Sequence, residues 1–266
     1  LDISRNDLHE VPEVVLEFSF CQALDMSHNF AVNAVFAQLN TLPALQSVNL
    51  RRNYLSGALP DELGALTQLT SLTLDENSIT ALPDTVSDLV ELHHLSICRN
   101  ALTAIKPAWL SSWLNLRYLD LRENKLTVLP PEIGQCLLME RLFIGSNAIE
   151  VLPDDIGKLR FLTELQAQNN KITVVPEALK ACTKLQLLHM GGNLLTELPA
   201  DLWECLPDLR ELYMYKNTIT AIPDELGTLH NLQILSMAGN KITSLPESVG
   251  TLTSLREVYL GGNPVR

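Results

Sequence analysis

Residues 232–252 read LQILSMAGNKITSLPESVGTL, a stretch that divides into two parts at its asparagine, Asn240. The first part, LQILSMAGN, alternates apolar residues with others, as a short strand does. The second part contains Pro246, which suits the first helical position because its φ is fixed there and its missing N–H is not needed. One strand and one turn cannot bury an apolar side alone, so the stretch needs neighbours of its own kind.

Such neighbours occur along the whole chain. The same frame recurs as LTSLTLDEN (69–77), LRYLDLREN (116–124), LRELYMYKN (209–217) and LREVYLGGN (255–263). Asparagine returns in steps of 23 or 24 residues, at positions 6, 29, 53, 77, 100, 124, 147, 170, 193, 217, 240 and 263. A proline follows six or seven residues later in ten of the eleven intervals, and Val35 stands in its place in the exception. This repetition predicts an α/β solenoid with a parallel sheet on one side and short helices or 3-10 turns on the other.

The polar residues of the repeat have structural roles. The asparagine amide can donate to and accept from backbone groups that would otherwise be buried without partners, which predicts a ladder of such amides. Twelve acidic residues lie within two residues of a repeat proline, where a carboxylate complements the free N–H groups of a helix start. Removing these twelve charges from the net charge gives −12 + 12 = 0, so the acidity comes mostly from the helix starts and is structural before it is functional.

The unit resembles the repeat of intracellular leucine-rich-repeat proteins of the Ras-suppressor and Scribble type, LxxLxLxxNxLxxLPxxIGxLxxL. Residues 139–159, MERLFIGSNAIEVLPDDIGKL, and residues 232–252 follow this pattern almost throughout. Residues 53–69, NYLSGALPDELGALTQL, are instead similar to the plant receptor-type repeat, LSGxLPxxLGxLxxL. The resemblance implies one horseshoe-shaped leucine-rich-repeat domain over residues 1–266, with about eleven complete repeats. It also implies protein binding, usually in signalling or scaffolding.

Composition excludes several classes of function. A net charge of −12 and the absence of a basic stripe argue against nucleic acid, and no apolar run approaches the roughly 18 residues that a membrane helix needs. The five cysteines are not clustered and no Asn-x-Ser/Thr sequon occurs, which favours a cytoplasmic protein. Neither end carries a recognisable polar cap, which predicts that the sequence is an excerpt of a longer protein.

No residue pattern indicates catalysis. Cys136, Cys182 and Cys205 fall six residues after a proline, in a slot held elsewhere by leucine, so we expect them in the core. Cys182 and Cys205 lie in adjacent repeats, which leaves a disulfide open. His94 and Cys98 are four residues apart on an expected strand, roughly 13 Å, too far for one metal ion. The glycine pairs before two of the asparagines lack phosphate-loop spacing. We therefore predict no enzyme, no metal site and no cofactor.

The outward strand positions of the carboxy-terminal half carry large side chains. The predicted partner-binding residues are Phe143, Leu187, His189, Tyr213, Tyr215, Ile234 and Tyr259. Gly191 and Ala238 border Tyr215 in the neighbouring repeats, so we expect its ring to stand out from the sheet. Large rings with a polar tip on a rigid sheet are typical of interface hot spots. The alternative is that these rings only stack on neighbouring strands.

Two other surfaces are weaker candidates. A secondary partner-binding set in the amino-terminal half is Arg51, Arg52, Arg99, Tyr118 and Arg122. Acidic residues on neighbouring strands can pair with these arginines, so a solvated, self-neutralised face is an equally good interpretation. Trp109 and Trp203 are expected on the convex side, and Trp113 falls in a core leucine slot.

These observations predict a protein-interaction module, a scaffold or adaptor in signalling, that binds a protein partner on its concave face. One alternative is the regulatory domain of a signalling enzyme (a kinase, a GTPase or a phosphatase complex) whose catalytic part lies outside this stretch. Another is a receptor ectodomain, which the LSGALP repeat suggests.

Overall fold

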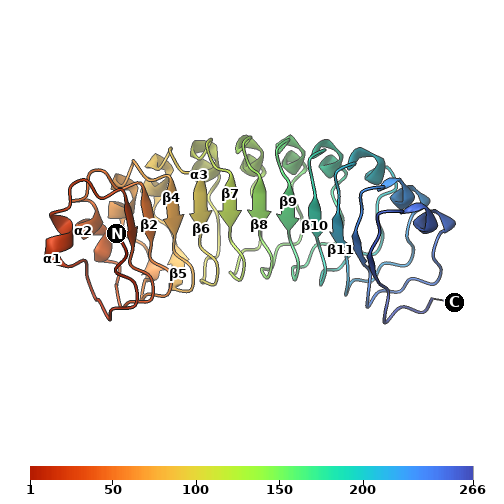
Figure 1. Cartoon of the computed structure of the whole chain (residues 1–266), viewed down its shortest axis with the longest axis horizontal. Helices are drawn as coiled ribbons and strands as arrows, with labels where there is room; N and C mark the ends of the chain where they lie inside the picture. The colour runs from red at the N-terminus through yellow and green to blue at the C-terminus, as the bar shows by residue number, and fades with distance from the viewer. Residues whose placement is uncertain (266) are drawn as a thin grey trace. The chain divides into compact units, whose positions relative to one another are not determined.

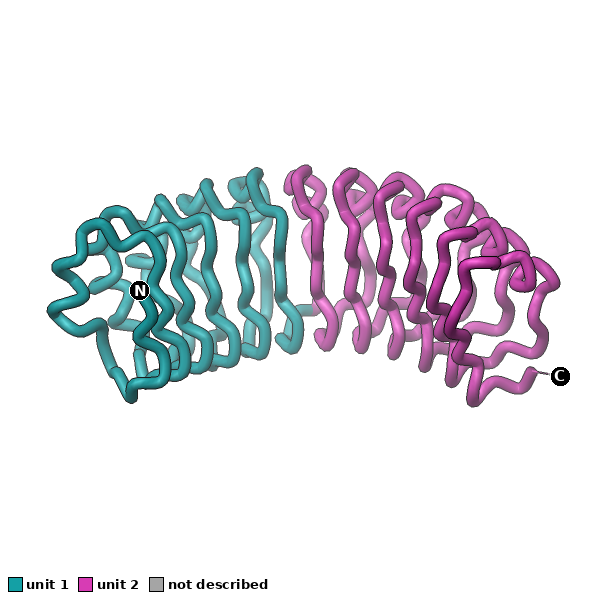
Figure 2. The backbone as a smooth tube through the Cα atoms, viewed as in Figure 1, with its two compact units in different colours: residues 1–126 teal, residues 127–266 magenta. Residues whose placement is uncertain are grey.

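The computed structural model describes residues 1–265 and divides into two compact units, residues 1–126 and 127–266 (Figure 2). Both units are built from the same repeat, in which a three-residue strand lies on one side and a short helix on the opposite side (Figure 1).

Unit 1 contains a parallel sheet in which each strand pairs with the strand of the next repeat. Its strands are β1 (Ala23–Asp25), β2 (Ser47–Asn49), β4 (Ser71–Thr73), β6 (His94–Ser96) and β7 (Tyr118–Asp120). A second, two-stranded parallel sheet joins β3 (Ser56–Ala58) to β5 (Ser78–Ala81). The helices are α1 (Glu13–Leu16), α2 (Val35–Leu39), η1 (Asp61–Ala65), η2 (Asp84–Asp88) and α3 (Pro107–Ser112), where η denotes a 3-10 helix.

Unit 2 repeats the arrangement with greater regularity. Its parallel strands are β8 (Arg141–Phe143), β9 (Glu164–Gln166), β10 (Leu187–His189), β11 (Glu211–Tyr213), β12 (Ile234–Ser236) and β13 (Glu257–Tyr259). Its 3-10 helices are η3 (Pro131–Gln135), η4 (Asp154–Lys158), η5 (Glu177–Ala181), η6 (Trp203–Cys205), η7 (Asp224–Thr228) and η8 (Glu247–Thr251). Parallel strands joined by short helices confirm the predicted solenoid.

The core of each unit lies between its strands and its helices. On β11, Leu212 is fully buried, whereas Glu211 and Tyr213 on either side of it are only partly buried. Trp113 is also fully buried, as its leucine slot predicts. The expectation that Trp109 and Trp203 offer a convex surface was wrong, because these side chains are 2% and 0% exposed and fill the core.

The repeat asparagines form the predicted ladder. Asn217 shows the pattern: its Nδ2 donates to the carbonyl oxygens of Met214, at 3.0 Å, and Met190, at 3.1 Å. Its Oδ1 accepts from the backbone N–H of Leu195 at 3.0 Å. One amide therefore satisfies backbone groups of its own repeat and of the preceding one, and its loss would leave them buried without partners.

The residue before the asparagine adopts a left-handed conformation that the repeat pattern does not reveal. Glycine supplies it at Gly192, Gly239 and Gly262, with φ between 67° and 77°. Other side chains adopt it with φ between 51° and 58° at Arg5, His28, Arg52, Glu76, Arg99, Glu123, Ser146, Asn169 and Lys216. Each non-glycine residue carries a strain of about 1 kcal/mol, which the surrounding repeat compensates.

Two local expectations need correction. Most repeat prolines, such as Pro153 and Pro176, cap the helix from the residue before it instead of occupying its first turn. Cys205 is partly exposed, and Leu206 fills the core slot instead, because this repeat has the longer 24-residue step. Cys136 and Cys182 are buried as predicted, and Cys182 and Cys205 are both free thiols.

Candidate partner-binding site

The exposed face of the unit 2 sheet, hereafter the unit 2 sheet face, is formed by the first and third residues of β8 to β13. Strand register places these residues in two rows that run across the strands. One row is Arg141, Glu164, Leu187, Glu211, Ile234 and Glu257, and the other is Phe143, Gln166, His189, Tyr213, Ser236 and Tyr259. Backbone pairing fixes the positions of both rows, so a partner that binds there does not have to order a loop.

His189, Tyr213 and Tyr215 form an aromatic cluster on this face. The His189 ring centroid lies 5.1 Å from that of Tyr213 and 5.4 Å from that of Tyr215, with tilted planes. His189 Nε2 and the Tyr215 hydroxyl are 3.1 Å apart and share a hydrogen bond. Sequence alone placed these three residues in one site, and the structure brings them into contact.

Tyr215 does not stand out from the sheet as expected. Its ring packs over Gly191, where an added Cβ would lie 2.9 Å from the Tyr215 Cε1 and Cζ atoms. The absence of a side chain at Gly191 therefore lets the ring lie flat toward His189, which leaves Tyr215 half-buried.

Burial governs the protonation of this cluster. Burial lowers the pKa of His189 to about 4, so the imidazole is neutral at physiological pH. Burial, together with the hydrogen bond to Glu211, raises the pKa of Tyr213 to about 12, so its hydroxyl remains a donor. The cluster thus presents neutral rings with fixed polar tips.

Acidic partners hold the tyrosines in place, and the sequence analysis missed them. The Tyr213 hydroxyl donates to Glu211 Oε2 at 2.8 Å, and the Tyr259 hydroxyl donates to Glu257 Oε2 at 2.7 Å. Gln166 Nε2 makes the equivalent bond to Glu164 Oε1 at 2.6 Å. The signal was visible in the repeated strands ELQ, ELY and EVY, each with glutamate two residues before a hydrogen-bond donor.

The remaining predicted residues differ in accessibility. Tyr259 is 50% exposed, and Leu187 and Ile234, in the row of first strand positions, are half-buried. Phe143 is only 6% exposed, so the expectation that its ring is presented to a partner was wrong. The accessible part of the predicted set therefore lies on β10 to β13.

The secondary arginine set, on the sheet face of unit 1, is occupied by ion pairs. Glu76 pairs with Arg51 and Arg52 and lies 3.7 Å from Arg99, which also pairs with Glu123 at 2.9 Å. Partial burial opposes ionisation of Glu76, yet hydrogen bonds from Arg51 and Arg52 lower its pKa. Glu123 and Asp120 add two further carboxylates that pair with Arg99 and Arg122, so this face is largely self-neutralised.

The buried Asp120 and the partly buried Asp75 complete this cluster, which surrounds a cleft of about 250 Å³. Arg122 Nη2 lies 2.6 Å from Asp120 Oδ2, and Tyr118, stacked on His94 at 4.2 Å, points its hydroxyl at the same oxygen. Asp75 accepts from the Ser96 hydroxyl at 2.6 Å, while burial raises the pKa of Asp75. Burial also raises the pKa of the adjoining Cys98 thiol to about 12, which leaves it a poor nucleophile.

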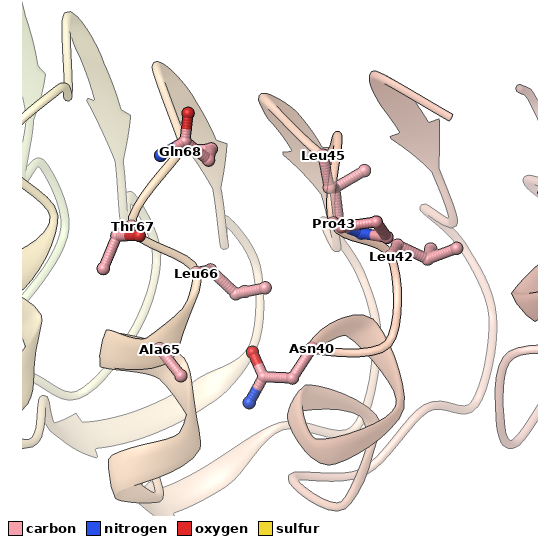
Figure 3. Close-up of a pocket in the computed structure, with 8 residues that line it drawn as sticks. All are labelled: Asn40, Leu42, Pro43, Leu45, Ala65, Leu66, Thr67 and Gln68. Atoms are coloured by element: carbon pink, nitrogen blue, oxygen red, sulfur yellow. The ribbon is translucent and has the colours of Figure 1, made fainter. Parts of the chain in front are cut away.

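A second hollow in unit 1 offers little chemistry. A pocket of about 120 Å³ lies between the segments that follow α2 and η1 (Figure 3). It is lined by Asn40, Leu42, Pro43, Leu45, Ala65, Leu66, Thr67 and Gln68, without a titratable side chain. Within residues 1–265, no group of His, Cys, Asp and Glu side chains is arranged to hold a metal ion. No helix in the same span is long and apolar enough to cross a membrane.

Comparison with known families agrees with this geometry. The family model described as leucine rich repeat matches residues 90–149, 162–219 and 207–265, and a second model of that description matches residues 44–66. The chain belongs to the leucine-rich-repeat family. Proteins of this family serve as protein–protein interaction modules, and their fold is a non-catalytic interaction fold.

Two curated proteins share segments with this leucine-rich-repeat chain. Adenylate cyclase of Schizosaccharomyces pombe is 34% identical over 80 residues, which are 30% of this chain and 5% of that protein. MAP kinase phosphatase with leucine-rich repeats protein 3 of Dictyostelium discoideum is 34% identical over 97 residues, which are 35% of this chain and 11% of that protein. The matches thus cover a small part of each relative.

Solved structures share the fold over almost the whole chain. The PEPR1–AtPEP1 structure superposes with a TM-score of 0.83 at 26% identity, covering 96% of this chain and 37% of that one. The ectodomain of the Arabidopsis receptor kinase HAESA was solved with an IDA peptide hormone. It superposes with a TM-score of 0.77 at 26% identity, covering 96% of this chain and 48% of that one. A leucine-rich-repeat protein of Leptospira interrogans superposes with a TM-score of 0.60 at 23% identity, covering 100% of this chain and 90% of that one. At this identity the match shows a similar fold alone.

Proposed function

We propose that this leucine-rich-repeat chain is a scaffold or adaptor module in cytoplasmic signalling, and that it docks a protein partner on the unit 2 sheet face. The docking site is centred on His189, Tyr213 and Tyr215 and extends to Tyr259. Its mechanism is reversible binding to preorganised side chains. The proposed kinship lies with the Ras-suppressor and Scribble type of repeat.

The observation that supports this proposal is the aromatic cluster on a rigid sheet. The His189 ring lies within 5.4 Å of both tyrosine rings and is hydrogen-bonded to Tyr215. Aromatic side chains with a polar tip dominate interface energetics because they bury a large area at a low cost in conformational entropy. The unit 1 sheet face, by contrast, has its arginines engaged in ion pairs of low net value.

A second candidate function is the regulatory domain of a signalling enzyme. The matched segments of an adenylate cyclase and a MAP kinase phosphatase support it, because both names denote signalling enzymes. The plant receptor structures similarly support a receptor ectodomain, since that of HAESA was solved with a peptide hormone bound. All three possibilities use the same docking face and differ in what the chain is attached to.

The test is loss of partner capture from a double variant, Tyr213→Ala with Tyr215→Ala. The variant should retain its far-ultraviolet circular dichroism spectrum, because both rings lie on the exposed side of the sheet. Affinity for proteins captured by the wild-type chain should fall at least about tenfold, since a hot-spot residue contributes about 2 kcal/mol or more.

The matched control is the triple variant Arg51→Ala, Arg52→Ala and Arg99→Ala on the unit 1 sheet face. We expect it to capture the same proteins with affinity unchanged within about threefold, because these arginines are neutralised within the fold. Loss of capture from the arginine variant together with full capture by the tyrosine variant would move the docking site to unit 1.

A further inference from the structure

The unit 2 sheet face alternates between two kinds of strand. β9, β11 and β13 begin with Glu164, Glu211 and Glu257, and each glutamate is hydrogen-bonded to the third residue of its own strand. The strands between them, β10 and β12, begin with Leu187 and Ile234. Backbone register therefore separates successive acidic positions by two strand spacings, roughly 10 Å.

Two strands with a tyrosine hydrogen-bonded to a glutamate lie on either side of β12. On one side β11 carries Glu211 bonded to Tyr213, and on the other side β13 carries Glu257 bonded to Tyr259. We call these four residues the Tyr–Glu frame. Between them β12 carries only Ile234 and the buried Ser236, so no aromatic or charged side chain of the sheet separates the two pairs.

The frame carries negative charge that the chain does not neutralise. Within residues 1–265, neither Glu211 nor Glu257 forms an ion pair, and each keeps a carboxylate oxygen that can accept from a ligand at the exposed face. Glu164, by comparison, adjoins Arg141 in the register and is a weaker acidic position. The unit 1 face shows what a neutralised arrangement looks like, because its Glu76 is paired with arginines.

This arrangement of carboxylates and rings suits one kind of ligand side chain. A lysine or arginine side chain extends an apolar stem that can pack on Ile234 and ends in a cation that can reach either carboxylate. The tyrosine rings on both sides add attraction, because their faces are electron-rich and bind cations. An acidic or purely apolar side chain would cover the two carboxylates without supplying a cationic partner.

We propose that the Tyr–Glu frame binds a lysine or arginine side chain of the protein partner, so that the ligand of this face is a basic segment. This inference rests on the proposed docking function and specifies the chemistry of the ligand. One basic residue of the ligand would bind the frame, and a second, about 10 Å away, would lie on the side of the frame toward Glu164.

The experiment selects ligands from a display library of random 12-residue peptides on the wild-type chain. Recovered peptides are then measured by fluorescence polarisation against Glu211→Gln with Glu257→Gln. The control is Asp154→Asn with Glu177→Gln, which removes the same charge from exposed starts of η4 and η5. Peptides enriched in lysine and arginine are expected, with affinity at least about tenfold weaker for the frame variant and within about twofold for the control.

The outcomes separate this inference from the function on which it rests. Peptides that lack basic residues but require Tyr213 would overturn the basic ligand and leave the docking face intact. Basic peptides that lose affinity equally in both charge variants would overturn the frame, because attraction would then come from net charge alone. Recovery of no peptide that depends on Tyr213 or Tyr215 would contradict both proposals.

Discussion

At the scale of single residues, the docking site depends on a glycine as much as on its aromatic rings. Tyr215 reaches His189 only because Gly191 has no side chain beneath the ring. Glu211 fixes Tyr213 in a similar way from the first position of the same strand. A glycine neighbour and hydrogen-bond partners thus set the geometry of the side chains that a protein partner would meet.

Gly191→Ala should therefore weaken partner binding without unfolding the chain. The new Cβ would lie 2.9 Å from the Tyr215 ring, which must rotate away and lose its bond to His189. Gly261→Ala is the matched control, because it is the equivalent position two residues before a repeat asparagine and its Cβ would meet nothing within 4 Å. Equal binding by both variants in an affinity measurement would contradict the account of Tyr215.

His189 gives the site a predictable response to pH. An unfolded histidine takes up a proton as the pH falls through about 6.5, whereas folded His189 does so only near 4 because burial lowers its pKa. Protons therefore favour the unfolded chain in this window. Relative to His189→Gln, the wild type should keep a constant stability above about pH 6.5 and lose stability progressively toward pH 4.

Urea titrations of both proteins at pH 7, 6, 5 and 4 measure this difference. A difference in unfolding free energy that stays constant over the whole series would show that His189 is not buried as the structure has it.

At the scale of the secondary-structure elements, successive 3-10 helices pack through glycine. A Cβ on Gly157 of η4 would lie 2.5 Å from the carbonyl oxygen of Ala178 in η5. Gly64, Gly134 and Gly227 meet the next helix in the same way. The glycine of the repeat pattern is thus required by close approach of neighbouring helices, and its φ is ordinary.

Gly157→Ala should destabilise the chain by about 1–3 kcal/mol, because the backbone of η5 must move away. Gly250→Ala changes the equivalent glycine of η8, where a Cβ meets nothing within 4 Å, and should change stability by no more than about 0.5 kcal/mol. Chemical denaturation of the two variants compares them directly, and equal costs would rule out helix contact as the reason for this glycine.

The elements also show what sequence could predict. Leucine spacing and the asparagine period predicted the strands, the sheet direction and the amide ladder, because these depend on a pattern repeated twelve times. The prediction that Cys205 lies in the core was wrong because one inserted residue in its repeat moves the core position to Leu206. The expectation for Trp203 was wrong because the same inserted residue moves it into the core slot that Leu63 and Leu110 fill in other repeats. The Trp109 ring turns inward from a position that polar residues such as Glu62 and Thr85 occupy in other repeats.

At the scale of the whole molecule, the two units present different sheet faces. In unit 1, arginines and carboxylates pair with one another. In unit 2, aromatic rings contact one another, and Glu211 and Glu257 lack cationic partners within residues 1–265. The sequence predicted the residues of both faces, because outward positions alternate along a strand. It did not predict that Phe143 is covered, or that glutamates anchor the tyrosines, because side-chain packing decides both.

Photo-crosslinking tests directly whether a protein partner docks on the unit 2 sheet face. Leu187 lies in register with Glu211 and adjoins the aromatic cluster, and it would be replaced by the photoreactive residue p-benzoylphenylalanine. Val151, which is 68% exposed and lies outside the strands, is the control position in the same unit. We expect a covalent adduct with the partner from position 187 and none from position 151. An adduct from position 151 alone would contradict docking on the unit 2 sheet face.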